Sequence, residues 1–218
     1  MFRDRQHAGE VLADLLAGYR GQPQTLLLAL PRGGVPVAAA LARALSLPLD
    51  IFPVRKLGAP GQPEFAMGAI AVSGLVVLHE DAIASLHISQ EAIDDAIARE
   101  HEELLRRERA YRGDRPPLVV TGQTVILVDD GLATGYTMLA AIRAIRQQQP
   151  ARIVVAVPVA PFETLDLLRP EVDELVCAHS PHMFAAIGQF YQDFTQTTDD
   201  QVREALQQIQ SPGTPHQA

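Results

Sequence analysis

Two adjacent aspartates, Asp129 and Asp130, are the residues of this chain best suited to do chemistry. They directly follow Val125–Val128, an apolar run typical of a strand covered on both faces. Ligands of open parallel sheets bind beyond the carboxyl ends of the strands, so both side chains are expected to face a crevice rather than a core. Carboxylates in such a place can hold the hydroxyl groups of a ligand.

The segment after the two acids is small, partly hydroxylated and opens a helix. Backbone N–H groups of such a loop can close around a phosphate at the helix N-terminus. The residues predicted to do so are Ala133, Thr134, Gly135, Tyr136 and Thr137. A polar strand-to-helix turn is the alternative, but strand, acid pair and loop occur in the order that a sugar-phosphate site requires.

Two further groups of residues are candidates for contact with an anion. In the loop Leu30–Gly34, Gly33 and Gly34 allow close approach of the backbone, and Arg32 can donate several hydrogen bonds to diphosphate oxygens. By itself this loop reads more simply as a glycine turn with a surface arginine.

Arg55 and Lys56 end the second predicted strand, before a Gly/Pro-rich stretch that looks too irregular for a helix or strand. Two solubilising charges at a strand edge are an equally good interpretation for Arg55 and a weaker one for Lys56.

The thirteen residues of Val125–Thr137 resemble the signature of the type I phosphoribosyltransferases. The resemblance implies that Asp129 and Asp130 hold the ribose 2′ and 3′ hydroxyls of 5-phosphoribosyl 1-pyrophosphate, while the following loop holds its 5′-phosphate. Gly131 is a departure, because that family usually has an aliphatic residue there.

The same resemblance gives the other loops their roles. It implies that Leu30–Gly34 is a pyrophosphate loop with a strained or cis peptide near Arg32. The bond before Pro31 is the alternative position for a cis peptide. It places Arg55 and Lys56 against diphosphate, and the stretch after them becomes a mobile lid. Asp129, Asp130 and Lys56 are then the catalytic candidates. Mg²⁺ would be the cofactor, with the two aspartates as its protein ligands, through water where they do not touch it.

The elements that must position these residues are strands alternating with helices. Apolar runs at 25–30, 49–54, 124–128 and 153–157, with a short fifth at 174–177, predict a mostly parallel sheet flanked by helices. One domain over residues 1–218 is expected. An inserted hood at about 68–115 interrupts it, with a hairpin around Ser73-Gly74 and a helix over Ser89–Arg112 that we interpret as solvated. Thr198 and Gln201 form a capping box that predicts a last helix, and the tail from Ser211 is expected to be frayed.

Bulk properties exclude several classes of function. The net charge of −8 and the lack of a broad basic face argue against nucleic acid, and no apolar run is long enough to cross a membrane. A charged N-terminal stretch and a single cysteine, Cys177, favour the cytoplasm. Motifs for nucleoside triphosphatases, dinucleotide folds, serine hydrolases and zinc proteases are absent from the sequence.

The segment Pro181–Phe194 weakly resembles the part of purine phosphoribosyltransferases that holds the base. Tyr191 and Asp193 are its acceptor-binding candidates, although aromatic core packing with a solvated acid is the better interpretation. Cys177, His179 and His182 lack a fourth ligand, so a zinc site is rejected.

The predicted function is transfer of a phosphoribosyl group to a nitrogen acceptor, with a nucleobase as the favoured class and a homodimer as the expected assembly. Two alternatives stay open. The chain could bind the sugar diphosphate as a regulatory sensor, or it could hydrolyse a phosphoribosyl diphosphate compound with water as the acceptor.

Overall fold

A parallel sheet forms the centre of the computed structural model, which describes residues 1–113 and 115–210. Within these residues the sheet has five strands in the order β2-β1-β6-β7-β8, all parallel. The strands are β1 (Thr25–Ala29), β2 (Leu49–Ile51), β6 (Thr124–Val128), β7 (Arg152–Val159) and β8 (Glu174–His179). The order confirms the predicted α/β class, and it brings β1 and β6, whose ends carry the candidate loops, next to each other.

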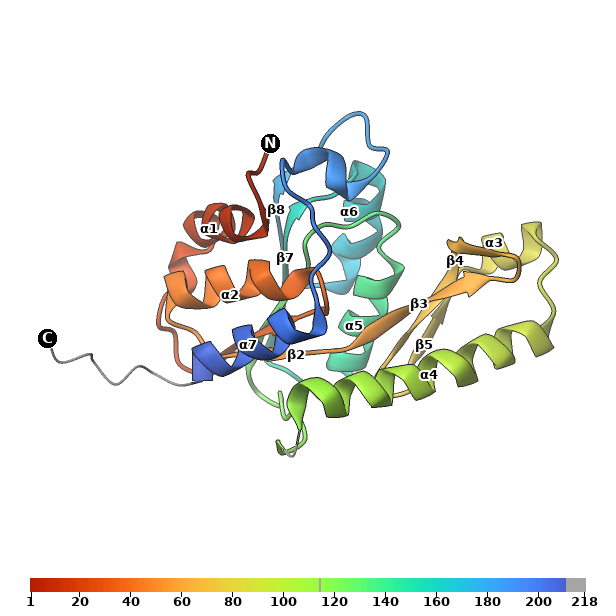
Figure 1. The fold of residues 1–218 in the computed structure, drawn as a ribbon, viewed down its shortest axis with the longest axis horizontal. Coiled ribbons are helices and arrows are strands. Elements are labelled where there is room, and N and C mark those ends of the chain that lie inside the picture. The colour runs from red at the N-terminus through yellow and green to blue at the C-terminus, as the bar shows by residue number, and fades with distance from the viewer. Residues whose placement is uncertain (114, 211–218) are drawn as a thin grey trace, which may run out of the picture.

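Helices cover both faces of this sheet (Figure 1). One layer packs α1, α2 and α7 against one face, and the other packs α5 and α6 against the opposite face. The bounds are α1 (Arg5–Leu15), α2 (Gly34–Leu45), α5 (Tyr136–Arg146), α6 (Phe162–Leu168) and α7 (Asp199–Gln210), with short 3-10 helices at η1 (Ala17–Tyr19), η2 (Arg169–Glu171) and η3 (Ile187–Phe190). Because both faces are covered, the strands are apolar on both sides, which is the pattern that identified them.

Capping residues fix the start of α1 and of α7. The Asp4 side chain accepts a hydrogen bond from the His7 N–H at 2.8 Å and caps α1. Thr198 and Gln201 exchange the two bonds of a capping box, at 2.9 and 3.2 Å, so the predicted last helix is confirmed. The tail from Ser211 lies outside the described residues.

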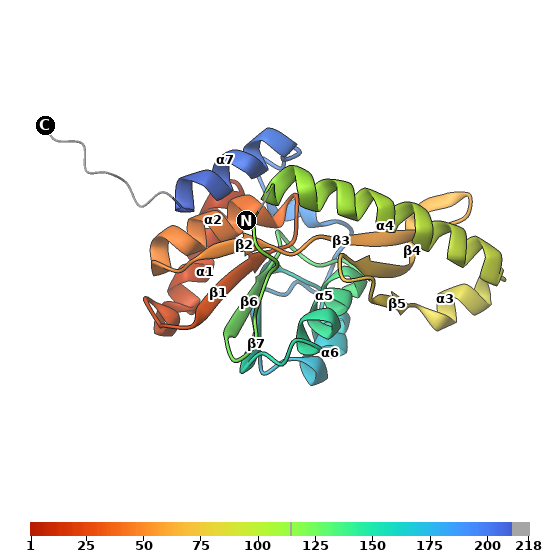
Figure 2. The same ribbon diagram turned by 90° about the horizontal axis from the view of Figure 1, so that it is seen from below.

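The hood, which we define as residues 54–112, is a second layer beside α5. Its sheet has the order β3-β4-β5 and is antiparallel within the described residues. The bounds are β3 (Val54–Ala59), β4 (Gln62–Ala71), β5 (Val76–Leu78), α3 (Glu80–Ser85) and α4 (Gln90–Arg112). Figure 2 shows α4 lying along this sheet, with its C-terminal end beside α7.

Two expectations for this region were wrong. The stretch after Lys56 is a β-hairpin rather than an irregular loop, because Gly61 takes a positive φ of 72° at the turn and the chain returns antiparallel to β3. The sheet therefore begins at Val54, earlier than the expected start of the hood.

The second concerns the long helix, which begins after its cap Ser89 as predicted but is not solvated all round. Ile93, Ala96 and Leu104 are buried against the hood sheet, in a cluster with Leu57 and Ile70. These few apolar residues fall on one face of a helix that is otherwise charged, which is why the overall composition concealed the packing face.

No helix in the described part of the chain is long and apolar enough to cross a membrane.

Candidate active site

The acid pair lies at the carboxyl end of β6, as predicted. The Asp129 carboxylate accepts a hydrogen bond from the N–H of Asp130 at 2.8 Å, which fixes its rotamer. Asp129 is half-buried, whereas Asp130 is buried with 8% of its surface exposed. Burial raises the pKa of Asp129 well above its usual range, and the neighbouring Asp130 charge raises it further. Burial also raises the pKa of Asp130, and the charge of Arg5 opposes this shift.

The pyrophosphate-loop candidates lie directly against these acids. A Cβ placed on Gly33 would be 2.1 Å from Asp130 Oδ2, and one on Gly34 would be 2.6 Å from the Val128 carbonyl oxygen. Only glycine permits this close approach of the two loops. The Pro31–Arg32 peptide is cis, which confirms the prediction of an unusual peptide near Arg32 and sets aside the bond that precedes Pro31.

The phosphate-loop candidates surround the start of α5. Gly135 has φ +81° and is the residue before the helix, where a Cβ would lie 2.7 Å from Thr164 Cγ2. The Thr164 hydroxyl on α6 donates a hydrogen bond to the carbonyl of Ala133, so α6 fixes the backbone of the phosphate loop. The loop conformation is therefore fixed by packing as well as by glycine.

These parts meet at one cavity of about 180 Å³, which we call the acid-pair cavity. It is lined by Lys56, Ala66, Gly68, Asp129, Asp130, Gly131, Leu132, Ala133, Thr134, Gly135, Tyr136, Thr137 and Ile187. The predicted acids and the contiguous phosphate loop are thus brought together with Lys56, which lies far from them in the sequence.

Arg55 and Lys56 lie on opposite faces of β3. Arg55 pairs across the strands with Ile70, whose side chain packs in the cluster under α4, and Lys56 pairs with Ala69, which packs against the α5 layer. The Arg55 guanidinium donates to Glu100 and lies 3.9 Å from Glu103, both on α4. Lys56 therefore lines the acid-pair cavity and Arg55 does not, although both residues also line a cavity of about 720 Å³ between the hood sheet and α4.

Arg32 is held by the last helix. Its guanidinium lies 3.5 Å from a carboxylate oxygen of Asp199, which also accepts a 2.7 Å hydrogen bond from the Tyr111 hydroxyl. The pKa of Asp199 is lowered, first by the hydrogen bond from Tyr111. The pyrophosphate-loop arginine is thus connected to both α4 and α7.

Gly131, the departure from the family pattern, has a packing explanation. A Cβ on this residue would lie 2.6 Å from Ile187 Cγ2 and 3.0 Å from Val159 Cγ1. Ile187 lines the acid-pair cavity beside Gly131. The aliphatic group that the family supplies next to the acids comes here from η3.

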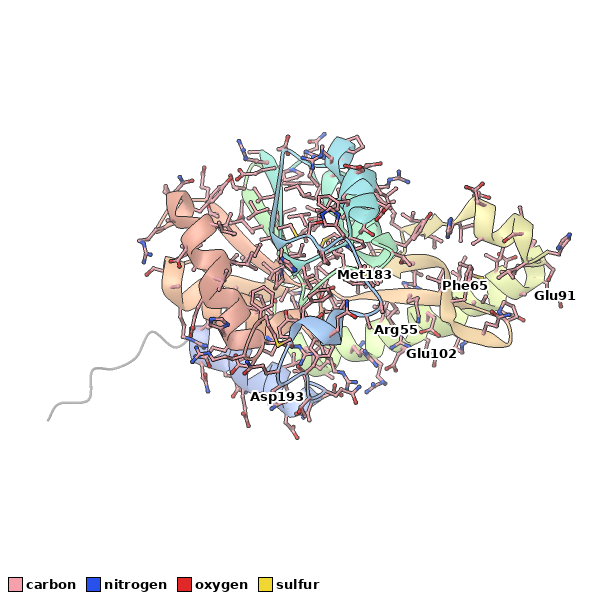
Figure 3. All side chains as sticks on the ribbon, turned by 90° about the horizontal axis from the view of Figure 1, so that it is seen from above. Arg55, Phe65, Glu91, Glu102, Met183 and Asp193 are labelled. Atoms are coloured by element: carbon pink, nitrogen blue, oxygen red, sulfur yellow. The ribbon has the colours of Figure 1, made fainter. Side chains whose placement is uncertain are left out.

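Tyr191 and Asp193 do not line the acid-pair cavity. Tyr191 is 6% exposed, packs against Phe2 and Phe194, and donates its hydroxyl to the Asp130 carbonyl oxygen at 2.6 Å. Burial raises its pKa strongly. Asp193 is exposed, lies near α7 in Figure 3 and accepts hydrogen bonds from Thr195. The geometry therefore favours aromatic packing plus a solvated acid over acceptor binding.

Two contacts of the site were missed from the sequence. Arg5 forms an ion pair with Asp130 across 125 positions, and no spacing pattern signals it. His79, which precedes α3 in the hood, stacks on Tyr136 of the phosphate loop with ring centroids 4.5 Å apart. Burial raises the pKa of Tyr136. The hood is thereby in direct contact with the phosphate loop.

Comparison with known proteins assigns the class. The family model for the phosphoribosyl transferase domain matches residues 4–194, so the chain belongs to the type I phosphoribosyltransferase family. Membership of this family supports a transferase.

Two curated relatives and two solved structures are similar to this chain over most of its length. The chain is 43% identical, over 202 residues, to the "Putative phosphoribosyl transferase" of two Mycobacterium tuberculosis strains; the match covers 93% of this chain and 45% of those proteins. The chain thus spans about half the length of these curated relatives. The crystal structure of TT1426 from Thermus thermophilus is 44% identical, with a TM-score of 0.78 over 95% of this chain and 98% of that one. The AQ2163 protein of Aquifex aeolicus shares the fold, with 11% identity, a TM-score of 0.52, and coverage of 93% of this chain and 84% of that one.

Proposed function

We propose that this chain transfers the phosphoribosyl group of 5-phosphoribosyl 1-pyrophosphate to a nitrogen acceptor of the nucleobase type, with release of diphosphate. The observation that supports this proposal is the acid-pair cavity itself. It combines two carboxylates, a helix N-terminal loop and Lys56 around a space of about 180 Å³. A family assignment alone would not require these groups to share one cavity.

In the proposed reaction the acceptor nitrogen forms a bond to ribose C1 while the bond from C1 to the diphosphate oxygen breaks. Diphosphate leaves with the bonding electron pair, and the acceptor then loses a proton. Positive charge develops on the sugar in the transition state. Asp129 and Asp130, which line the cavity, would stabilise this charge and orient the hydroxyls. Lys56 and Arg32 would contribute fixed positive charge to the departing diphosphate.

The residues of the cavity fit a magnesium ion that is held mainly by the substrate. The described residues contain no cluster of three or more His, Cys, Asp or Glu side chains able to hold a metal. Mg²⁺ usually keeps several waters and binds one or two carboxylates plus substrate phosphates, and Asp129 and Asp130 can supply that share. When bound, the ion would act as a Lewis acid on the leaving group.

Isothermal titration with 5-phosphoribosyl 1-pyrophosphate and Mg²⁺ tests the proposal. Wild type should bind, and Asp130→Asn should bind more weakly and turn over far more slowly, while Asp193→Asn, an exposed acid outside the cavity, serves as the matched control. Diphosphate release should require an added acceptor. Release without any acceptor would identify a hydrolase, binding without release would identify a sensor, and no binding at all would remove the proposal.

A further inference from the structure

Arg5, the first residue of α1, makes the shortest charged contact to the acid pair. Its Nε lies 2.7 Å from Asp130 Oδ2, and each of the two side chains is only 11% exposed. Arg5 is not part of the signature that identified the site.

The position of this guanidinium is fixed by two further contacts. A second nitrogen, Nη1, donates to the Thr195 carbonyl oxygen at 2.7 Å, and the guanidinium carbon lies 3.9 Å from the centroid of the Phe194 ring. The planar fork of arginine is suited to this combination of directed hydrogen bonds and stacking, which lysine cannot reproduce.

Asp130 is held on its backbone by the same C-terminal segment. The Tyr191 hydroxyl donates to the Asp130 carbonyl oxygen at 2.6 Å, and the backbone of Gly33 approaches the carboxylate from the opposite loop. The acid is therefore fixed by residues from both ends of the chain. A carboxylate fixed in this way loses little freedom when it binds a hydroxyl group.

We propose that Arg5 is a positioning residue: it holds Asp130 Oδ2 so that Oδ1 accepts a hydrogen bond from a ribose hydroxyl. This inference rests on the proposed function, because it requires a ribose in the acid-pair cavity. It differs from a purely structural role, in which Arg5 would stabilise the fold without affecting how the cavity distinguishes sugars.

The experiment compares sugars rather than reaction rates. Ribose 5-phosphate, 2-deoxyribose 5-phosphate and 3-deoxyribose 5-phosphate are titrated into wild type, Arg5→Met and Arg5→Lys. Wild type should prefer ribose over at least one deoxy sugar by about tenfold, the loss expected when one hydrogen bond to a charged group is removed. Arg5→Met should reduce that preference to about twofold or less, and Arg5→Lys should restore only part of it.

Control variants separate the possible outcomes. Arg3→Met removes an exposed arginine two positions away and should leave the preference unchanged. If Arg5→Met fails to fold, Phe194→Leu is used instead, since it removes the stacking ring without changing any charge, and the same loss of preference is expected.

Equal weakening of all three sugars by Arg5→Met, or tighter binding, would overturn the inference while leaving the proposed function intact. A wild type that binds none of the sugars, or binds them all equally, would contradict the sugar site itself.

Discussion

Carboxylates of the acid-pair cavity and carboxylates of the hood lie in contrasting surroundings. Asp129 is packed beside a second acid, and burial raises its pKa. Glu103 on α4 accepts hydrogen bonds from Arg106 and Arg107 instead, and chiefly the bond from Arg106 lowers its pKa to about 2. An ionised carboxylate whose pKa is raised in the folded state destabilises the fold, whereas one whose pKa is lowered stabilises it. Arg5 offsets part of this cost in the cavity, where the pKa of both aspartates is still raised, whereas the arginines of α4 more than offset it at Glu103.

Two neighbouring cations also differ in the region that each one faces. Arg55 forms ion pairs with acids of α4, and Lys56, on the opposite face of β3, lines the acid-pair cavity. Adjacent residues of one strand thus serve different regions. This gives the most direct way to test whether the two regions differ in function as well as in electrostatics.

Lys56→Met should have the largest effect. We expect binding of 5-phosphoribosyl 1-pyrophosphate to weaken by roughly 10–100-fold, because a charge-assisted hydrogen bond to diphosphate contributes about 1.5–3 kcal/mol. Arg55→Met should change that affinity by less than about twofold. It should lower the free energy of unfolding by about 1 kcal/mol, since it leaves Glu100 without one of its partners.

Isothermal titration and urea denaturation of both variants measure these two quantities. The comparison fails if Arg55→Met weakens binding as much as Lys56→Met does. In that case the hood ion pairs would have to open when the ligand binds, and the two regions could not be treated as separate.

Much of the fold was predictable because its signals are local. The apolar runs that predicted β1, β6 and β7 are buried on both faces, so each of these strands can be recognised from its own residues. The hairpin of β3 and β4 could not be recognised from the sequence. Gly61 and its neighbours are turn residues that resemble a loop, and the strand that pairs with β3 lies beyond them.

The candidate site divides in the same way. Asp129, Asp130 and the loop to Thr137 are contiguous in sequence and line one cavity. The contacts of Arg5 with Asp130 and of Arg32 with Asp199 depend on tertiary packing between segments more than a hundred residues apart, and sequence spacing carries no information about them. Strand alternation could have separated Arg55 from Lys56, had the strand been recognised.

Asp129→Asn provides a test of the cost of charge in the cavity. We expect the ligand-free variant to be more stable than wild type at pH 7, because the substitution removes a buried charge whose carboxyl pKa is raised. The variant should also bind 5-phosphoribosyl 1-pyrophosphate more weakly. Denaturant unfolding without ligand measures the first effect and titration the second.

The pH dependence of this effect has a definite sign. The folded-state pKa of Asp129 lies above the unfolded value, so the folded state binds more protons between the two, and wild-type stability falls as pH rises through that window. The advantage of Asp129→Asn should therefore shrink as pH is lowered through the folded-state pKa of Asp129 toward the unfolded value. A variant that is less stable than wild type at pH 7 would show that the cavity does not strain the fold.

Glu103→Gln should have the smallest effect, and the opposite sign. The folded-state pKa of Glu103, about 2, lies below the unfolded value, so its contribution to stability is full above pH 4.5 and is lost as pH falls toward 2. The side chain is 28% exposed, and solvent screening reduces the contribution to about 0.5 kcal/mol. We expect Glu103→Gln to be less stable than wild type by this amount at pH 7.

Glu102→Gln is the matched control, since Glu102 is an exposed neighbour on the same helix (Figure 3). It should leave stability within about 0.2 kcal/mol at either pH, in keeping with the small effects of exposed charges. Unfolding curves at pH 7 and pH 2.5 test the electrostatic role of Glu103, because the difference in stability between Glu103→Gln and wild type should shrink at the lower pH. A difference that stays constant with pH would mean that Glu103 acts through packing on α4, and the electrostatic contrast between hood and cavity would then rest on Asp129 alone.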